Sequence, residues 1–515
     1  MATRWLFGED RICGVVAATT AREMWQQLRE AARHTQTVEL RLDWLGSERE
    51  LQVFLVRLRR TRLSRGVRLI ATCRCIGAGG RFSKSVTGQL AVLRRAIGAG
   101  CHWVDLEIES VRASARFTRD LCTAGAPRIL SFHDFAKTPK KSELGRLPRK
   151  LERTAQAAGF DAVKIAARCD SLAESLRILA LAQGKRNVIA VPMGEIAAPT
   201  RILALREGSA LAYAPVELAT APGQVPLAKM TELYRAGKLD GQTRVYGVIG
   251  DPIEHSLSPA LHNTGFAARR VNAVYLPFLV RNLGDFLAAI EPLGLQGFSI
   301  TIPHKERILR HLDDCDALAA QIGAVNTVVV RGGAKLFGYN TDYLGALRAL
   351  ERRMPIAGSR VLIFGAGGVA RAVAFALARG GAAVALCARR MERARKLARA
   401  IHGAAIPRKA LRREFFDAIV NATPVGMHPR TSDSPLEARE LNCRLVFDTI
   451  YRPRKTRLLQ LAAACGIETV SGLEMFLAQG IAQWEIWMGE RAPEAAMRRA
   501  VVAALRREEE GREKK

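Results

Sequence analysis

Short apolar runs alternate with longer amphipathic stretches along the chain as far as about Tyr213. The runs rich in β-branched residues have the length of strands, and there are eight: Ile12–Ala17, Val38–Leu42, Val67–Thr72, Trp103–Ile108, Arg128–Ser131, Ala162–Ala166, Val188–Val191 and Leu211–Tyr213. Amphipathic segments rich in Ala, Leu and Arg, such as Ala21–Arg33 and Gly88–Ala99, separate most of these runs and predict helices. Strands that alternate with helices predict a parallel sheet, so eight of them predict a (β/α)8 barrel.

A second α/β region follows a predicted break in the chain. A last barrel helix is predicted at Thr231–Ala236, and the polar segment Gly237–Thr243 marks a boundary before a new strand at Val245–Ile249. A later strand, Val361–Phe364, leads into a glycine-rich turn and a helix ending near Arg379. The predicted divisions are a barrel over residues 1–237, a substrate-binding part over 244–345, a dinucleotide-binding part with C-terminal helices over 346–505, and a frayed charged tail over 506–515.

The glycine-rich turn has the order of elements that a dinucleotide site requires. Glycines there permit a tight turn and let the backbone approach a pyrophosphate at a helix N-terminus. The residues predicted to contact the cofactor are Gly365, Ala366, Gly367, Gly368, Val369 and Ala370. The alternative is a plain turn between a strand and a helix.

The end of the next strand, at Cys387, indicates which cofactor is used. An NAD site usually places an acid at this point to bind the ribose 2′-hydroxyl. This chain instead continues Ala388-Arg389-Arg390, and the guanidinium groups of Arg389 and Arg390 are suited to a 2′-phosphate. The sequence therefore predicts NADP, the alternative being two ordinary surface arginines.

The charge balance changes the range of possible partners. Lys and Arg total 79 against 49 Asp and Glu, a formal net charge of +30, which attracts polyanions non-specifically. The basic residues are scattered over predicted helices, however, and no zinc-finger or basic-zipper signature appears. A polyanion-binding protein is therefore a minor hypothesis, no specific nucleic-acid partner is expected, and an anionic small-molecule substrate fits the charge equally well.

Other classes of protein are disfavoured by composition. No uninterrupted apolar run approaches the ~18 residues of a membrane span, and the first ten residues are too short and too charged for a signal peptide. We expect a cytoplasmic protein with reduced cysteines and no membrane partner. Cys73 and Cys75 form the only close cysteine pair, which is too few ligands for a metal site, so no metal is expected.

The second half of the chain resembles shikimate dehydrogenase from about Val245 to about Glu485. The ordered motifs that carry the resemblance are Gly250–Pro259, Ser299–Lys305, Gly323–Thr327, Gly338–Asp342, Asn421–Met427, Asp448–Tyr451 and Gly472–Gln479. The resemblance implies that Lys305 donates a proton to a ring ketone, that Asp342 holds and tunes Lys305, and that NADPH supplies the hydride.

The same motifs imply the remaining contacts of the reductase. The positions matched to substrate contacts are Ser256, Ser258, Thr301, Asn326, Tyr451 and Gln479, and those matched to the cofactor include Thr423 and Gly472. Both loop serines are present, which favours shikimate over quinate. Two residues depart from the family: Ala388 stands where Asn is common, and His304 where Phe is common.

The first half resembles type I 3-dehydroquinate dehydratase, a (β/α)8 enzyme that works through a Schiff base. The matched segments lie within about residues 11–235 and are Glu39–Asp43, Thr72–Arg74, Asp105–Glu107, Ser131–Phe135, Val163–Ala166, Met193–Glu195 with Arg201, and Ala221–Gln224. The positions matched to substrate binding are Glu39, Arg41, Arg74, Arg201, Thr220 and Gln224.

Lys164 stands out even without the family, because it interrupts an apolar run. Burial should lower the pKa of its amine and free it as a nucleophile that forms an imine with a ketone. The imine makes the neighbouring C–H acidic, and His133, at the end of the preceding strand, is placed to take that proton before water leaves. The family gives both residues these roles.

One departure bears on the barrel's chemistry. The family usually carries Glu-Gly-Gly after the Thr-x-Arg segment, and that Glu partners the catalytic histidine, whereas this chain has Ala78-Gly79-Gly80. Glu39 and Glu107 are the candidate replacements. Thr220 also replaces a Ser.

The leading hypothesis is a bifunctional enzyme that converts 3-dehydroquinate through 3-dehydroshikimate to shikimate. The alternative is an active shikimate dehydrogenase joined to a catalytically impaired barrel.

Overall fold

The computed structural model describes residues 6–513 except 62, 64–65, 114–124 and 218–222. The chain forms two compact units, the first built on residues 1–244 and the second on most of residues 245–515. Each has its own sheets and its own apolar core, so each is described by itself.

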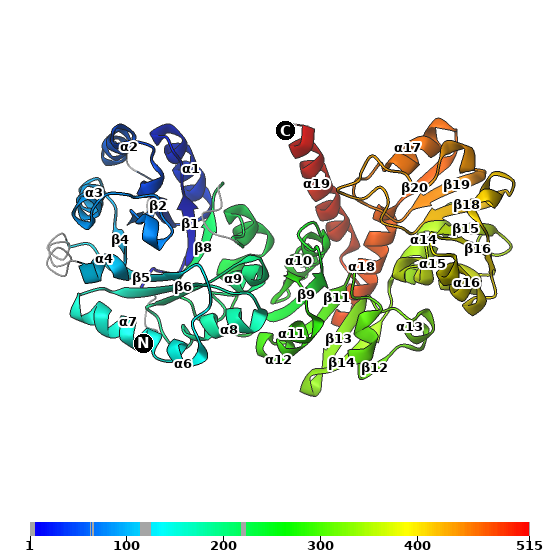
Figure 1. Cartoon of the computed structure of the whole chain (residues 1–515), viewed down its shortest axis with the longest axis horizontal. Coiled ribbons are helices and arrows are strands. Elements are labelled where there is room, and N and C mark those ends of the chain that lie inside the picture. Colours follow the sequence, from blue (N-terminus) through cyan, green and yellow to red (C-terminus); the bar gives the residue numbers. More distant parts are fainter. Residues whose placement is uncertain (1–5, 62, 64–65, 114–124, 218–222, 514–515) are drawn as a thin grey trace. The chain divides into compact units, whose positions relative to one another are not determined.

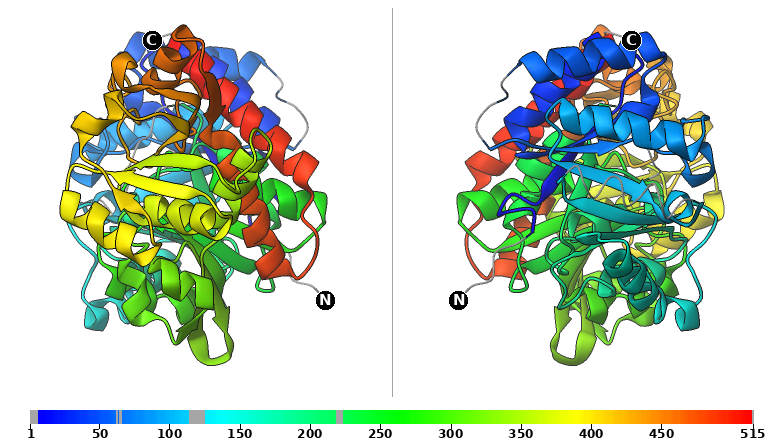
Figure 2. Two further views of the ribbon diagram at one scale, coloured as in Figure 1. Left: turned by 90° about the vertical axis from the view of Figure 1, so that its right-hand side faces the viewer. Right: turned by 90° about the vertical axis from the view of Figure 1, so that its left-hand side faces the viewer.

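The first unit is a parallel barrel of eight strands surrounded by helices (Figure 1; Figure 2, right). The strands are β1 Ile12–Val16, β2 Thr37–Arg41, β3 Arg68–Thr72, β4 Trp103–Glu107, β5 Arg128–Asp134, β6 Ala162–Arg168, β7 Val188–Met193 and β8 Ala212–Pro215. The strand order β7-β6-β5-β4-β3-β2-β1-β8 brings β7 and β8 to the two ends, where the Ala210 amide donates to the Val188 carbonyl at 2.9 Å. The predicted strands and the nearly closed barrel are confirmed.

Helices follow most of the barrel strands. Their bounds are α1 Ala21–His34, α2 Glu48–Arg60, α3 Val86–Gly98, α4 Ile108–Ala113, α6 Lys141–Leu144, α7 Leu147–Ala157, α8 Leu172–Ala180 and α9 Ala198–Ile202. Polar caps fix where several begin: Thr20 accepts a hydrogen bond from the Glu23 amide, and Ser171 accepts one from the Glu174 amide.

The predicted helix at Thr231–Ala236 is wrong in detail. The structure has a π-helical turn at Lys229–Leu233 and a 3-10 turn at Ala236–Lys238. Arg235 lies between them with φ at +49°, and this left-handed backbone interrupts the helical path.

The second unit contains a mixed sheet and a fully parallel sheet. The mixed sheet, in the order β10-β9-β11-β13-β14-β12, consists of β9 Arg244–Gly250, β10 Ala273–Leu279, β11 Leu295–Ile300, β12 Asp314–Cys315, β13 Thr327–Arg331 and β14 Lys335–Tyr339. Its helices are α10 Ser258–Ala268, α11 Leu283–Ala288, α12 Ile290–Leu293 and α13 Ala317–Ile322. Helix α14, Asp342–Glu351, leads from this sheet to the next.

The parallel sheet has the strand order β17-β16-β15-β18-β19-β20 of a doubly wound dinucleotide-binding fold. Its strands are β15 Arg360–Phe364, β16 Ala383–Cys387, β17 Ala404–Ala405, β18 Phe416–Asn421, β19 Cys443–Asp448 and β20 Glu468–Ser471. Its helices are α15 Gly368–Arg379, α16 Met391–Ala400, α17 Arg457–Ala464, α18 Gly472–Met488 and α19 Glu494–Glu513. The predicted Rossmann architecture is confirmed.

Alternating side chains build one apolar core on each face of this sheet. Val361 and Ile363 face the side covered by α14, α15 and α16, whereas Leu362 faces the side covered by α17 (Figure 1; Figure 2, left). The chain winds in one direction from β15 to β17 and in the other from β18 to β20. The carboxyl ends of β15 and β18 therefore lie at the crevice between the two helix layers.

The expectation of a frayed tail over residues 506–515 is wrong for the part that is described. Residues 506–513 continue helix α19. Arg and Glu are favourable helix formers, so a segment without apolar residues can still extend an existing helix.

We predict that Phe447→Ala destabilises the second unit by about 3–5 kcal/mol, because the ring is fully buried in the core of the parallel sheet. Phe415→Ala is the matched control: its ring is 45% exposed, and we expect a change below about 1 kcal/mol. Urea unfolding followed by hydrogen exchange in peptides of this unit measures both. Equal losses would contradict the assignment of the core.

Candidate active sites

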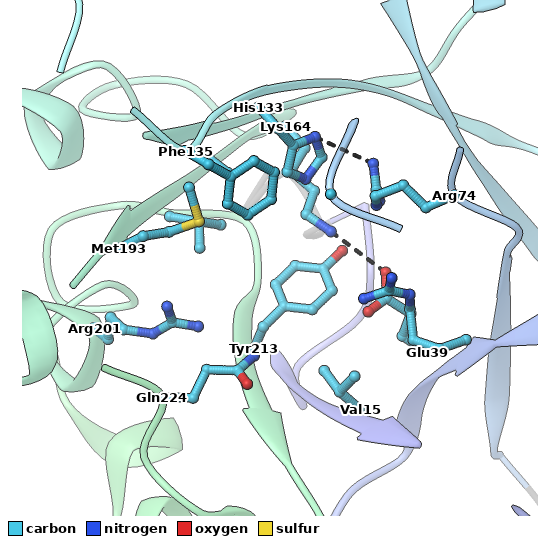
Figure 3. A pocket seen from close by; sticks show the side chains of 14 residues that line it. Val15, Glu39, Arg74, His133, Phe135, Lys164, Met193, Arg201, Tyr213 and Gln224 are labelled. Atoms are coloured by element: carbon cyan, nitrogen blue, oxygen red, sulfur yellow. Dashed lines mark hydrogen bonds and ion pairs between the residues drawn. The ribbon is translucent and has the colours of Figure 1, made fainter. Parts of the chain in front are cut away.

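A pocket lies at the carboxyl ends of the barrel strands (Figure 3). We call this the barrel pocket. Its lining residues come from most strands and the loops that follow them: Val15, Glu39, Arg41, Arg74, Gly79, His133, Phe135, Lys164, Ala166, Val191, Met193, Arg201, Tyr213 and Gln224. Charged and polar side chains therefore share its wall with apolar ones.

Lys164 lies on β6 at the centre of this pocket and is buried, as predicted. Its amine is 3.0 Å from an Asp105 carboxylate oxygen and 3.3 Å from one of Glu39. These two carboxylates pair with the ammonium and so counter the desolvation that burial imposes. Sequence reasoning anticipated the burial of Lys164 but not this pairing.

Asp105 connects Lys164 to a second buried cation. Arg74, which follows β3, donates to Asp105 at 3.0 Å, and the Ser131 hydroxyl donates to the same oxygen at 2.6 Å. Burial alone would raise the pKa of Asp105, but Arg74 and Lys164 outweigh it and hold that pKa below its usual range. Asp105 therefore stays ionised and balances the charge of both cations.

His133, on β5, faces the barrel pocket beside Lys164, and its ring nitrogen Nδ1 lies 3.1 Å from an Arg74 guanidinium nitrogen (Figure 3). Because an arginine only donates, Nδ1 of a neutral imidazole accepts this bond and Nε2 carries the proton. Burial, followed by the charges of Arg74 and Lys164, lowers the pKa of His133 well below 6.5. The imidazole is therefore held neutral at physiological pH.

Neither candidate replacement for the missing glutamate reaches His133. Glu39 accepts from Lys164 and from the Thr72 hydroxyl, and Glu107 accepts from the Cys75 amide and the Gln89 side chain. Ala78 is buried in a short 3-10 turn. The contact that the structure shows at Nδ1 of His133 is thus with an arginine and not with a carboxylate.

The other predicted substrate-binding residues differ in how free they are to bind. Arg41 forms a two-point ion pair with Asp43, at 3.0 and 2.8 Å. Arg201 is buried on α9 without an acidic partner among the described residues, and burial lowers its pKa to about 10. Gln224 lines the pocket, while Thr220 lies outside the described residues.

The second unit brings Lys305 and Asp342 together, as predicted. The Lys305 amine donates to an Asp342 carboxylate oxygen at 2.5 Å. Asn326 donates to the other Asp342 oxygen at 2.9 Å and lies 3.5 Å from the Gln479 side-chain oxygen. Four of the predicted residues therefore form one connected group, which we call the Lys305 cluster.

The predicted serines lie on the loop after β9 and at the start of α10. The Ser256 hydroxyl accepts from the Ser258 amide at 3.3 Å, and the Ser258 side chain bonds to Tyr275. Tyr451 packs its ring against Phe476, 4.4 Å between centroids, on the helix that carries Gln479.

Thr301 ends the strand beside β9, where a side chain at Gly250 would collide with its methyl group. His304, the residue that replaces a common Phe, is buried next to Lys305.

The glycine-rich turn of the parallel sheet has a backbone that fits a dinucleotide. Gly365 has φ at +129°, and a Cβ there would lie 2.8 Å from the Ala422 carbonyl, so only glycine is tolerated. Open space surrounds Gly367, and Gly368 begins the 12-residue helix α15, whose first amides point into the turn. A Cβ added at Gly368 would lie 3.5 Å from the Cβ of Lys305, so the turn adjoins the Lys305 cluster.

The arginines predicted to select the cofactor lie at the expected place. Arg389 and Arg390 are exposed just after β16, and neither forms an ion pair with a described residue. Thr423, on the loop after β18, donates to Asn421, which donates in turn to the buried Asp448. Gly472 starts α18 so close to the Thr449 carbonyl that a side chain would not fit.

Models of three protein families match this chain. Type I 3-dehydroquinase matches residues 12–240, the shikimate dehydrogenase substrate binding domain matches 248–328, and the shikimate 5′-dehydrogenase C-terminal domain matches 472–502. A bifunctional 3-dehydroquinate dehydratase/shikimate dehydrogenase from Arabidopsis thaliana is 34% identical over 478 residues, which cover 88% of this chain and 78% of that protein. The chain belongs to this bifunctional family.

Single-function relatives match the second half. A shikimate dehydrogenase (NADP(+)) from Symbiobacterium thermophilum is 44% identical over 283 residues, 52% of this chain and 96% of that protein. A Thermus thermophilus shikimate 5-dehydrogenase, solved with NADP(H) and shikimate, is 36% identical and covers 51% of this chain and all of its own, with a TM-score of 0.48. The NADP expected from Arg389 and Arg390 agrees with the cofactor in the name of the Symbiobacterium thermophilum enzyme.

Several residues of the bifunctional enzyme's barrel pocket were missed by sequence reasoning. Asp105, Ser131 and Tyr213 were read as strand residues, although Asp105 lay within a matched segment. A polar residue in a strand signals a site only when its neighbours on other strands are known. In the described part of the chain, no helix has the length and apolar character to cross a membrane, and no group of three or more His, Cys, Asp or Glu is arranged for a metal.

We predict that His133 is neutral at pH 6.5 and protonated on Nε2. A nitrogen-15 NMR titration measures both properties, with the signal assigned by its loss in a His133→Gln variant. Arg74→Leu removes one cause of the lowered pKa and should raise it toward 6.5 without reaching it, because burial, the largest cause, remains. A wild-type imidazole that is half protonated at pH 6.5 would contradict this electrostatic picture.

Proposed function

We propose that this chain dehydrates 3-dehydroquinate to 3-dehydroshikimate in the barrel pocket and reduces 3-dehydroshikimate to shikimate at the Lys305 cluster. The observation that carries the proposal is the buried Lys164, which lies between two carboxylates in the barrel pocket. The same pocket contains His133 and an Arg201 that has no acidic partner among the described residues. Family membership over most of the chain supports the same two reactions.

In the dehydratase, each charged group has a role that its surroundings support. Arg201 lacks an acidic partner among the described residues and binds the substrate carboxylate. Lys164 attacks the ketone, and the protons that its nitrogen gives up leave with the carbonyl oxygen as water. For His133 to serve as the base, Arg74 must turn from Nδ1 toward a substrate oxygen, which then replaces the imidazole as acceptor.

In the reductase, the Lys305 amine donates the proton that the ketone oxygen needs as it becomes a hydroxyl. Asp342 accepts a hydrogen bond from that amine at 2.5 Å and so orients it, while Asn326 fixes Asp342 from the other side. Ser256, Ser258, Thr301, Tyr451 and Gln479 surround the substrate with hydroxyl and amide groups that suit a polyhydroxylated acid.

The dinucleotide turn fits NADP, which supplies the hydride when bound. The α15 amides after Gly367 hold the pyrophosphate, and the two guanidinium groups after β16 hold the 2′-phosphate. Ala366, Val369 and Ala370 complete the turn, while Thr423 and Gly472 contact the cofactor from the neighbouring loops. We further propose the domain limits 1–237, 244–345 and 346–505, and a cytoplasmic location; the Arabidopsis relative is described as chloroplastic.

A second candidate function is a shikimate dehydrogenase with an impaired dehydratase. The observation that favours it is the Arg74 contact with His133, because it leaves the Nε2 nitrogen as a donor rather than a base.

A crossed pair of variants distinguishes these functions. Wild-type protein mixed with 3-dehydroquinate and NADPH is expected to oxidise NADPH. In Lys164→Ala, the rate of NADPH oxidation from 3-dehydroquinate should fall by about 100-fold or more, while the reduction of 3-dehydroshikimate should remain. Lys305→Ala should still produce 3-dehydroshikimate without oxidising NADPH. Each variant is thus the folding control for the other.

The outcome for the wild-type protein decides between the candidates. NADPH oxidation from 3-dehydroshikimate alone would mean that the barrel is impaired. Borohydride then shows where the barrel fails, since a trapped adduct on Lys164 means that the imine still forms.

We predict that Arg389→Ala combined with Arg390→Ala raises the KM for NADPH by about 10- to 100-fold, the value of one or two charge-assisted hydrogen bonds, and changes the KM for NADH little. Arg399→Ala, an exposed arginine near the other end of α16, is the matched control. Steady-state kinetics with both cofactors measure the effect. Equal changes for NADPH and NADH would refute recognition of the 2′-phosphate.

A further inference from the structure

Tyr213 is a residue of the barrel pocket that none of the steps above uses. It lies on β8 and is only 6% exposed, and its ring lines the pocket. Its buried hydroxyl makes no hydrogen bond to any described residue. Leaving a buried hydroxyl unpaired costs about 1–3 kcal/mol, so an orphaned group aimed into a pocket indicates a bond made to a ligand.

The position of Tyr213 relative to Lys164 suggests which ligand atom it meets. The Lys164 amine lies 3.9 Å from the centre of the tyrosine ring, and Figure 3 shows the hydroxyl turned toward that amine. A ketone carbon that forms a bond to the Lys164 nitrogen must come within about a bond length of it. The oxygen of that ketone therefore lies near the Tyr213 hydroxyl.

The chemistry of the other neighbours makes Tyr213 distinctive. Glu39 and Asp105, which flank the amine, are carboxylates and can only accept hydrogen bonds. Burial, followed by the charges around it, raises the pKa of the Tyr213 phenol well above 10, so the group stays protonated and is available as a donor. Beside the two carboxylates that flank Lys164, the phenol is thus a neutral donor.

We propose that the Tyr213 hydroxyl donates a hydrogen bond to the substrate's keto oxygen while Lys164 adds to the carbonyl carbon. The proposal rests on the proposed dehydratase function and assigns a further catalytic residue to it.

The step balances without any other reactant. The nitrogen–carbon bond forms as the carbonyl π pair moves onto oxygen, where negative charge develops beside the phenol. Two of the three protons of the Lys164 ammonium end on that oxygen, which leaves as water while the nitrogen lone pair closes the C=N bond. Tyr213 keeps its own proton throughout and stabilises the oxygen as its charge grows.

The test removes only the hydroxyl. Tyr213→Phe keeps the ring beneath Lys164, and Tyr234→Phe, which deletes the phenol of another buried tyrosine in the same unit, is the matched control. The imine is trapped with borohydride at successive times after mixing with 3-dehydroquinate, and the adduct on Lys164 is measured by mass. Steady-state kcat and KM for dehydration, and the melting temperature of each variant, complete the comparison.

We expect Tyr213→Phe to slow imine formation and lower kcat by about 100-fold, the lower end of the range for losing a donor to a developing oxyanion, with little change in KM. Tyr234→Phe should match the wild type.

Three other results would overturn the proposal. Wild-type rates in Tyr213→Phe would show that the hydroxyl does not act. A raised KM with unchanged kcat would show that it only binds the substrate. A wild-type protein that forms no imine would refute the dehydratase function itself, and this last result is separate because it is seen without any substitution.

Discussion

Parallel strand pairing is the constraint on which both sites depend. In a parallel sheet every strand ends at the same edge, so residues far apart in sequence are delivered to one place by backbone geometry alone. The barrel brings Glu39, His133, Lys164 and Tyr213 from four strands into one pocket in this way, and places Asp105 of a fifth strand against Lys164. In the second unit, the carboxyl ends of β15 and β18 place the glycine turn beside Thr423.

Charge balance is the second requirement of the barrel pocket. Lys164 and Arg74 are both buried, and each is stable there because Asp105 accepts from both. The same arrangement governs His133, since Arg74 reaches from Asp105 to the imidazole. The loss of a glutamate at position 78 is therefore not an isolated change: it leaves the imidazole under the influence of a network built around the lysine.

Local patterns in the sequence were enough to predict the strands of the barrel and the dinucleotide turn, because both depend on short-range signals, either apolar periodicity or a motif with fixed spacing. The pairing of Lys305 with Asp342 was expected only from the resemblance to shikimate dehydrogenase. The chain path at Arg235 was missed because a left-handed backbone at an arginine has no such signal. The helical end of α19 was missed because a charged segment without apolar residues resembles a tail until the helix before it is known.

Contacts across strands were the least predictable part of the sites. Which carboxylate pairs with Lys164, and which group lies on Nδ1 of His133, depends on the register between neighbouring strands, such as Ser131 opposite Lys164. A shift of one residue would turn every one of these side chains to the other face of the sheet. Sequence alone therefore named Lys164, His133 and Arg74 but neither the Asp105 and Tyr213 beside them nor which of these groups contact one another.

The use of arginine rather than lysine in the barrel pocket has one more consequence. A guanidinium group keeps its proton throughout the neutral pH range, even at Arg201 with its pKa lowered to about 10, so Arg201 gives the pocket a positive charge that no described carboxylate pairs with. Its attraction for a carboxylate is accordingly insensitive to the acidity of the surroundings. The same charge attracts other small anions, so inorganic sulfate or phosphate is expected to compete with the substrate carboxylate for Arg201.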